Sequence, residues 1–317
     1  MPFTVSVHEQ EAFPVITLHD TDSGCEAEIY TFGGLLNSFK IPLANNLINI
    51  VDGFNSVADA IKNITNGFKS AKLSPFVCRM YKGNYQFDNK AYHVNKHYLK
   101  QHAIHGLVYD GIYSIVNTSA DTSQAKATLV YQYQGSDDGY PFTYNITLNW
   151  KLEAGNKLTV ATTVVHHNIQ PIPLADGWHP YFRLGDSIDD CTLQFNSATQ
   201  LAFDGDLLPT GKTIADTRFI NGSSLQDISL DNSYQLDPLV TQPSCVLSNK
   251  VLKLTVEPDK SYPILQIYTP IHRKSIAIEN LSGAPDNFNN GMGLILLSPN
   301  EPKVFTTSYA ITAINEY

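Results

Sequence analysis

Hydrophobic and polar residues alternate along much of the chain, in short runs rich in β-branched and aromatic residues. This period of two sends one set of side chains toward a core and the other outward or toward a second sheet. Turn-forming clusters at residues 135–141, 153–157 and 257–263 separate several of the runs. The clearest runs cover residues 13–20, 25–34, 127–134, 142–154, 157–167, 251–259, 262–270, 274–280 and 301–312.

The runs follow one another without long helical patterns between them. They predict an all-β fold, a large antiparallel β-sandwich with short helices in its loops. One segment differs, because Val57, Ile61, Ile64 and Phe68 recur at helical spacing and predict a short helix that caps a sheet end. We find no repeat, low-complexity tract or linker, so we expect a single domain over residues 1–317.

The net charge of the chain argues against some classes of binding partner. The chain has 21 basic and 30 acidic residues, a formal charge of −9, and no basic run that could follow a phosphate backbone. Nucleic acid and anionic membranes are therefore not expected as partners. The first residues lack the pattern of a signal peptide, and no stretch reaches the ~20 apolar residues of a membrane span, so we expect a cytoplasmic location.

Cysteine and histidine could indicate a metal centre, but their spacing does not. The four cysteines are far apart with no CxxC pair, so we expect free thiols. His166 and His167 are adjacent, which on a strand sends them to opposite faces. The remaining candidates show no HxH pair beside a carboxylate, so we expect no metal; they are His93, His97, His102 and His105.

Three polar residues have sequence neighbours that suggest a role in binding or catalysis. His105 precedes Gly106, a position where the backbone can approach another segment closely. His179 lies in a cluster of aromatic residues, which suits a sugar because a pyranose offers apolar C–H patches ringed by hydroxyls. Glu279 ends an apolar run before a loop rich in Gly, Pro and Asn, where partial burial could raise its pKa and make it a base.

In order along the chain, these segments resemble the galactose mutarotase-like family, the aldose 1-epimerases. The resemblance covers most of the chain, and its most specific part is WHPYFRL at residues 178–184. The other matching segments are Gly33–Gly34, the stretch 73–94, HAIHG at 102–106, the strand 140–152, LLPTGK at 207–212, LDNSYQL at 230–236, LQIYT at 265–269 and IAIEN at 276–280.

The resemblance implies the family's supersandwich fold and an enzyme that interconverts the α and β anomers of an aldohexose. It implies Glu279 as general base and His179 as general acid. Arg79, His105, Asp231 and Gln266, with Tyr181 as a further candidate, would then hold the sugar hydroxyls. Ring opening and closure involve no redox or phosphate chemistry, so no cofactor is expected.

Proton removal from the C1 hydroxyl and proton delivery to the ring oxygen need a base and an acid, each worth about 10²–10⁴ in rate. We expect a carboxylate and an imidazolium on opposite sides of the ring, a charge on Glu279 maintained by Arg79 or another donor, and a bell-shaped dependence of rate on pH. Cys78 departs from the family pattern, since many members have Asn there. Substrate choice therefore stays open.

Other functions remain possible. A hexose-6-phosphate 1-epimerase would need cations to hold the phosphate, for which Lys72, Arg79 and Arg183 are candidates. A carbohydrate-binding protein without catalysis would use the same histidines and aromatic residues, and a structural β-sandwich would have no ligand. For any of these we expect a monomer or homodimer.

Overall fold

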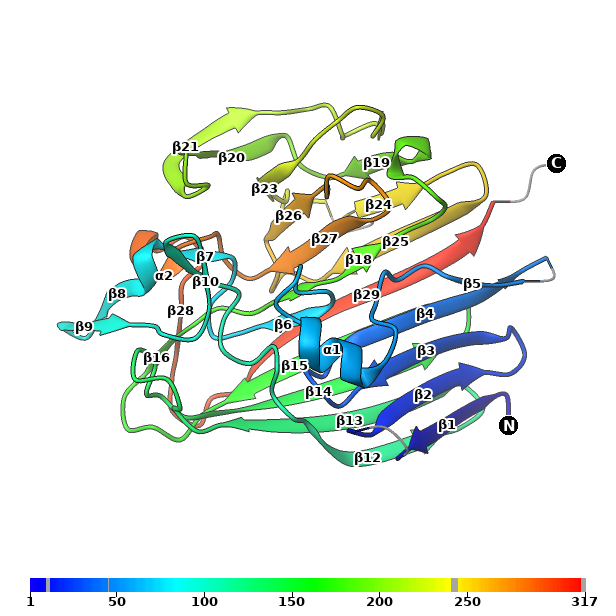
Figure 1. The fold of residues 1–317 in the computed structure, drawn as a ribbon, viewed down its shortest axis with the longest axis horizontal. Helices are drawn as coiled ribbons and strands as arrows, with labels where there is room; N and C mark the ends of the chain where they lie inside the picture. Colours follow the sequence, from blue (N-terminus) through cyan, green and yellow to red (C-terminus); the bar gives the residue numbers. More distant parts are fainter. Residues whose placement is uncertain (10–11, 45, 241–244, 315–317) are drawn as a thin grey trace.

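The computed structural model describes residues 1–9, 12–44, 46–240 and 245–314. Its largest sheet has nine antiparallel strands and forms one layer of the molecule (Figure 1). In order across the sheet these strands are β12 (Ser114–Ala120), β13 (Gln124–Tyr133), β14 (Tyr144–Glu153), β15 (Lys157–Val165), β29 (Lys303–Ala313), β25 (Leu252–Pro258), β24 (Cys245–Ser248), β19 (Thr192–Phe195) and β22 (Ser223–Ser224).

A second layer consists of two sheets. The five-stranded sheet has the order β1 (Phe3–His8), β2 (Val15–Asp20), β3 (Cys25–Tyr30), β4 (Leu36–Leu43) and β5 (Asn46–Asn49). The eight-stranded sheet comprises β21 (Pro209–Ala215), β20 (Thr199–Phe203), β23 (Asp231–Gln235), β26 (Ile264–Tyr268), β27 (Ile276–Leu281), β17 (Gly177–His179) and β6 (Ala71–Leu73), with β18 (Tyr181–Phe182) also paired to β27.

The chain that follows β5 links these two sheets. Val51 forms a bridge with Phe182, and the Asp52 amide donates to the Tyr181 carbonyl at 2.9 Å. The Arg183 amide likewise donates to the Ile50 carbonyl at 2.9 Å. The sheets therefore form one continuous layer that faces the nine-stranded sheet.

Aromatic side chains fill the space between the layers. Trp178 meets Trp150 edge to face at 5.5 Å, and Phe182 packs on Tyr309 at 5.4 Å between ring centroids. Such contacts bury much apolar area and hold the two sheets in one arrangement. The antiparallel sandwich is confirmed, and each of the nine predicted runs contains a strand.

The predicted helix is confirmed in part. Helix α1 spans Val57–Asn63 and begins at Ser56, whose hydroxyl accepts the Asp59 amide. It ends before Phe68, which follows Gly67 in a left-handed conformation. Ile61 was expected on the apolar face, but 41% of it is exposed.

The remaining described elements are short and lie at the ends of the sheets. They are β7 (Arg79–Met80), β8 (Asn84–Phe87), β9 (Lys90–His93), β10 (Tyr98–Leu99), β11 (His102–Ile104), β16 (Ile172–Leu174), β28 (Ile295–Leu297), α2 (Asn287–Asn290) and the 3₁₀ turns Tyr81–Gly83 and Ile188–Asp190. Over the described residues no helix has the length and apolar character needed to cross a bilayer. All four cysteines are buried and free, as predicted.

Candidate active site

Glu279 lies inside strand β27, and only 2% of it is exposed. Its neighbour across the strand pair is Gln266 on β26. The sequence placed Glu279 at the end of a strand, but the pairing continues through Leu281. The carboxyl group is therefore held by a paired strand and almost fully removed from water.

His179 ends strand β17, next to β27, with 4% of it exposed. Its Nε2 lies 3.4 Å from Oε1 of Glu279. The two groups were expected on opposite sides of a sugar ring, but this separation is too small for a ring to lie between them. They stand side by side and face the same edge of any ligand.

His105 directly follows strand β11 and lies close to the same pair. Its backbone is left-handed, with φ +63°, and its amide donates to the Cys78 carbonyl at 2.9 Å. The His105 ring stands edge-on to the His179 ring, 4.8 Å between centroids, and tilts against Phe68 at 4.6 Å. A Cβ at Gly106 would come within 2.3 Å of the Ser74 carbonyl oxygen, so this turn requires glycine.

Three polar side chains form the neighbouring wall. Gln266 donates to Asp231 Oδ1 at 2.8 Å and accepts a hydrogen bond from Ser233. Arg79 Nη2 lies 4.0 Å from Asp231 Oδ2. These groups come from β23, β26 and β7, and a set of alternating donors and acceptors is suited to bind hydroxyl groups.

A cavity of about 220 Å³ joins these groups. All seven site residues predicted from the sequence line it, including Tyr181, whose ring lies 5.1 Å from that of His179. The structure thus brings together residues from 79 to 279 in the chain. Eight further residues line the cavity, namely Thr65, Gly67, Phe68, Cys78, His97, Leu99, Ile104 and Tyr268.

Comparison with known proteins agrees with this geometry. The family model described as aldose 1-epimerase matches residues 14–310. The chain belongs to the aldose 1-epimerase family. Aldose 1-epimerases are isomerases, so this protein is an enzyme of that class. The uncharacterized protein YihR of Escherichia coli K12 is 25% identical over 238 residues, which cover 73% of this chain and 75% of YihR.

Solved structures of aldose 1-epimerase-like proteins share the fold. A galactose mutarotase-like protein from Clostridium acetobutylicum superposes with a TM-score of 0.87 at 19% identity, over 99% of both chains. A galactose 1-epimerase from Lactobacillus acidophilus gives 0.83 at 20% identity, over 98% of both. The predicted galactose mutarotase-like fold is therefore confirmed.

Burial dominates the electrostatics of the epimerase cavity. It raises the pKa of Glu279 well above the usual range, with Asp231 adding to the effect and Arg79 opposing it. Burial lowers the pKa of His179 to about 4 and that of His105 well below its usual value. The expectation that Arg79 or another donor keeps Glu279 ionised does not hold in this desolvated site, because burial outweighs the effect of Arg79.

Each of these three side chains also keeps a polar atom without a hydrogen bond: Nδ1 of His105, Nδ1 of His179 and Oε2 of Glu279. The three could offer ligands to a cation, with donor atoms within 4.8 Å of one another. A tetrahedral zinc site with bonds of about 2.0–2.1 Å needs ligands roughly 3.3 Å apart. The trio would have to contract around an ion, whereas hydroxyl groups can reach it as it stands.

Sequence reasoning missed two aromatic walls. Phe68 was assigned to a helix, but left-handed backbone at Gly67 and Phe68 turns its ring onto His105. Tyr268 lies two residues after Gln266 on the same strand, so its side chain shares the face that lines the cavity. That spacing was a usable signal.

Two further sequence predictions can now be judged. Cys78 does line the cavity, and burial, with Glu279 adding to it, raises the pKa of its thiol well above the usual value, so the thiol is neutral. Lys72 was a candidate for holding a phosphate, but it is fully buried and paired with Asp176. It does not line the cavity, and neither does Arg183.

Proposed function

We propose that this enzyme interconverts the α and β anomers of an unphosphorylated aldohexose. The observation that supports this most directly is the buried pair of His179 and Glu279, 3.4 Å apart in a cavity lined by hydroxyl-binding groups. At about 220 Å³ the cavity is smaller than the roughly 300–1,000 Å³ typical of sites for larger ligands. Its size suits one sugar ring.

The proposed reaction opens the ring and closes it on the other face of C1. Glu279 takes the proton of the C1 hydroxyl and His179 gives a proton to the ring oxygen. The C1–O5 bond then breaks and the C1–O1 bond becomes a carbonyl. After rotation about C1–C2 the same two groups reverse their roles during closure. O1 and O5 are bonded to the same carbon, so two groups standing side by side can serve both.

The shifted pKa values fit this proposal when the two groups are treated as one unit. Burial makes the Glu279 carboxylate a stronger base and the His179 imidazolium a stronger acid. At pH values between the two pKa values the pair holds one proton, which can be on either partner. The two arrangements differ only by a proton transfer across 3.4 Å. The pair is reactive while it keeps that single proton.

The other predicted residues would hold the sugar. Arg79, Asp231 and Gln266 form a connected set that can donate to and accept from neighbouring hydroxyls. His105 and Tyr181 close the cavity around the reacting pair. We also propose that the chain acts as a single domain, since one core cluster extends from Phe3 to Ile311.

A polarimetric substrate panel tests this function. Freshly dissolved α-glucose and α-galactose should lose their initial rotation faster with protein than without it. Glu279→Gln and His179→Asn should each return the rate to the uncatalysed value, while Glu301→Gln, a change at an exposed carboxyl, should not. If the wild-type protein leaves every aldose at its uncatalysed rate, the proposal is wrong.

Two alternatives predict different results in the same panel. A hexose-6-phosphate 1-epimerase would turn over glucose 6-phosphate faster than glucose; of its candidate cations only Arg79 lines the cavity. A carbohydrate-binding protein without catalysis would show heat of sugar binding in calorimetry and no rate enhancement.

A further inference from the structure

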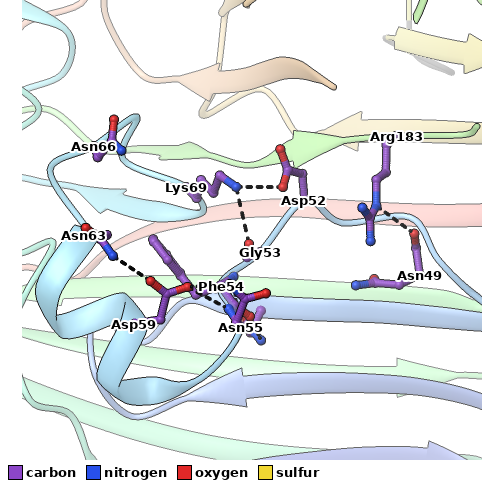
Figure 2. Close-up of a pocket in the computed structure, with 11 residues that line it drawn as sticks. Asn49, Asp52, Gly53, Phe54, Asn55, Asp59, Asn63, Asn66, Lys69 and Arg183 are labelled. Carbon is purple, nitrogen blue, oxygen red and sulfur yellow. Dashed lines mark hydrogen bonds and ion pairs between the residues drawn. The ribbon is translucent and has the colours of Figure 1, made fainter. Parts of the chain in front are cut away.

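A second hollow lies on the other side of the loop between α1 and β6. Its larger part, about 460 Å³, is drawn in Figure 2. A smaller part of about 310 Å³ shares Asp52, Lys69 and Arg183 with it and adds His272 and Lys274. We call the two parts together the donor groove. The larger part is lined by Asn37, Asn49, Asp52, Gly53, Phe54, Asn55, Asp59, Asn63, Asn66, Lys69 and Arg183.

The donor groove is separate from the active-site cavity. The two share no lining residue, although one loop borders both. Asn66 and Lys69 face the groove, whereas Gly67 and Phe68 face the cavity. Ser275, which binds Asp52 of the groove, precedes Glu279 by four residues, roughly 13 Å along a strand.

The carboxylate groups that line the groove already accept hydrogen bonds. Lys69 donates to Oδ1 of Asp52 at 2.7 Å, and Ser275 donates to Oδ2 of the same residue at 2.7 Å. Asp59 accepts from the side chains of Asn55 and Asn63 (Figure 2). Both carboxylates that line the groove are therefore satisfied.

Donor groups, by contrast, remain available. The Nε of Arg183 donates to the Asn49 carbonyl at 3.4 Å, and its two terminal nitrogens make no hydrogen bond to a described residue. The side chains of Lys274 and Asn66 likewise have no hydrogen-bond partner among the described residues. Among the residues that the structure describes, His272 uses only Nδ1, which accepts a hydrogen bond from the Lys274 amide at 3.0 Å.

We propose that the donor groove binds a polyhydroxylated anion of the sugar phosphate class. A phosphate supplies acceptor oxygens for Arg183 and Lys274, and charge-assisted bonds of this kind are among the strongest in proteins. Hydroxyl groups of the same ligand can accept from the unpaired amide of Asn66. A formal charge of −9 repels anions in general, but the smaller part of the groove brings Lys69, Arg183 and Lys274 together beside Asp52 and so provides a local exception.

Calorimetric titration with glucose 6-phosphate tests the groove, with inorganic phosphate as a second probe. Lys274→Gln should weaken the binding of both probes about tenfold, because one charge-assisted contact to the phosphate is lost. Asn66→Ala should weaken only glucose 6-phosphate. The matched control is Lys126→Gln, which removes the same charge from an exposed position on β13 of the other layer and should change neither.

The titration is repeated in saturating glucose, which would occupy the active-site cavity. Glucose 6-phosphate should still bind with one site per chain. Displacement by glucose, equal weakening by Lys126→Gln, or no binding of either probe to the wild-type protein would each overturn the proposal. Since turnover is not measured, failure of the proposed epimerase activity would leave this result interpretable.

Discussion

Two buried polar clusters lie on opposite faces of strand β17 and differ in how their charges are satisfied. On the face toward the nine-stranded sheet, Lys72 pairs with Asp176 at 2.5 Å and donates to the Gly177 carbonyl at 3.0 Å. Tyr262 donates to the same Asp176 oxygen at 2.6 Å. The opposite charges meet directly; Oδ2 of Asp176 has no hydrogen bond to a described residue, but neither the active-site cavity nor the donor groove reaches it.

On the other face, His179 and Glu279 stand 3.4 Å apart, and each keeps an atom without a hydrogen bond. Buried polar atoms without partners cost stability, so a fold retains them where another need applies. The comparison teaches that burial alone does not identify a site. Unmet hydrogen-bonding capacity beside a cavity does.

The largest expected effect is on the rate. Glu279→Gln should lower kcat for mutarotation by about 10²–10⁴, because the base is lost while size and shape are kept. Polarimetry at saturating sugar measures it. An unchanged kcat would show that the unsatisfied cluster is not the reacting pair.

A mutation in the buried cluster of Lys72 and Asp176 should affect the stability of the fold instead of the rate. Lys72→Met should lower the free energy of unfolding by about 3–5 kcal/mol, since Asp176 would lose its only buried cation partner among the described residues. Urea unfolding gives this value, and kcat per folded molecule should stay close to wild type. If kcat fell while stability held, the two clusters would not have separate roles.

The pH dependence of kcat/KM tests the protonation state of the pair formed by His179 and Glu279. Burial lowers the pKa of His179 to about 4 and raises that of Glu279, so above about pH 4 the pair keeps one proton until Glu279 titrates. The value of kcat/KM should therefore fall about tenfold per pH unit below about pH 4, where the pair gains a second proton. A fall in kcat/KM on the acid side that already sets in above pH 6 would instead mean that His179 titrates as an ordinary imidazole.

The free energy of unfolding should also show how much the buried carboxyl group of Glu279 destabilises the fold. The pKa of Glu279 is higher in the folded state than in the unfolded state. At pH values above the unfolded-state pKa the folded protein therefore binds more protons, and its stability falls as the pH rises. Glu279→Gln removes this penalty and should gain about 1 kcal/mol at pH 8, with less gain at pH 5. Urea unfolding of both proteins at the two pH values measures it, and a loss at pH 8 would contradict this account.

The smallest expected effect concerns the aromatic wall. Phe68→Leu keeps an apolar side chain but loses the ring contact with His105, so KM should rise about threefold with little change in kcat. A matched change at Phe87→Leu, in the β8–β9 hairpin and outside the cavity lining, should leave both constants unchanged.

Alternation along the chain predicted the strands because a half-buried strand must place every second side chain inside. The same pattern could not locate what covers each face. Glu279 was expected at a partly buried strand end, and Lys72 was a candidate for holding a phosphate, yet both are almost fully buried. Strands that are distant in sequence decide whether a buried charged side chain faces an oppositely charged partner or a cavity. The assembled sheets are therefore needed to tell a structural ion pair from a candidate site residue.

Phe68 illustrates a second limit. Helical spacing from Val57 onward was correct as far as Asn63, but Gly67 allows the chain to leave the helix with positive φ. Spacing assumes a regular backbone, and one residue in a left-handed conformation redirects every side chain after it.

The loop that carries Asn66, Gly67 and Phe68 forms a partition with a different pocket on each side. If both pockets bind their proposed ligands, any shift of this partition on binding at one pocket would change the affinity of the other. Thermodynamic linkage then requires the exchange to be symmetrical: the factor by which an anion alters the sugar's affinity equals the factor by which the sugar alters the anion's.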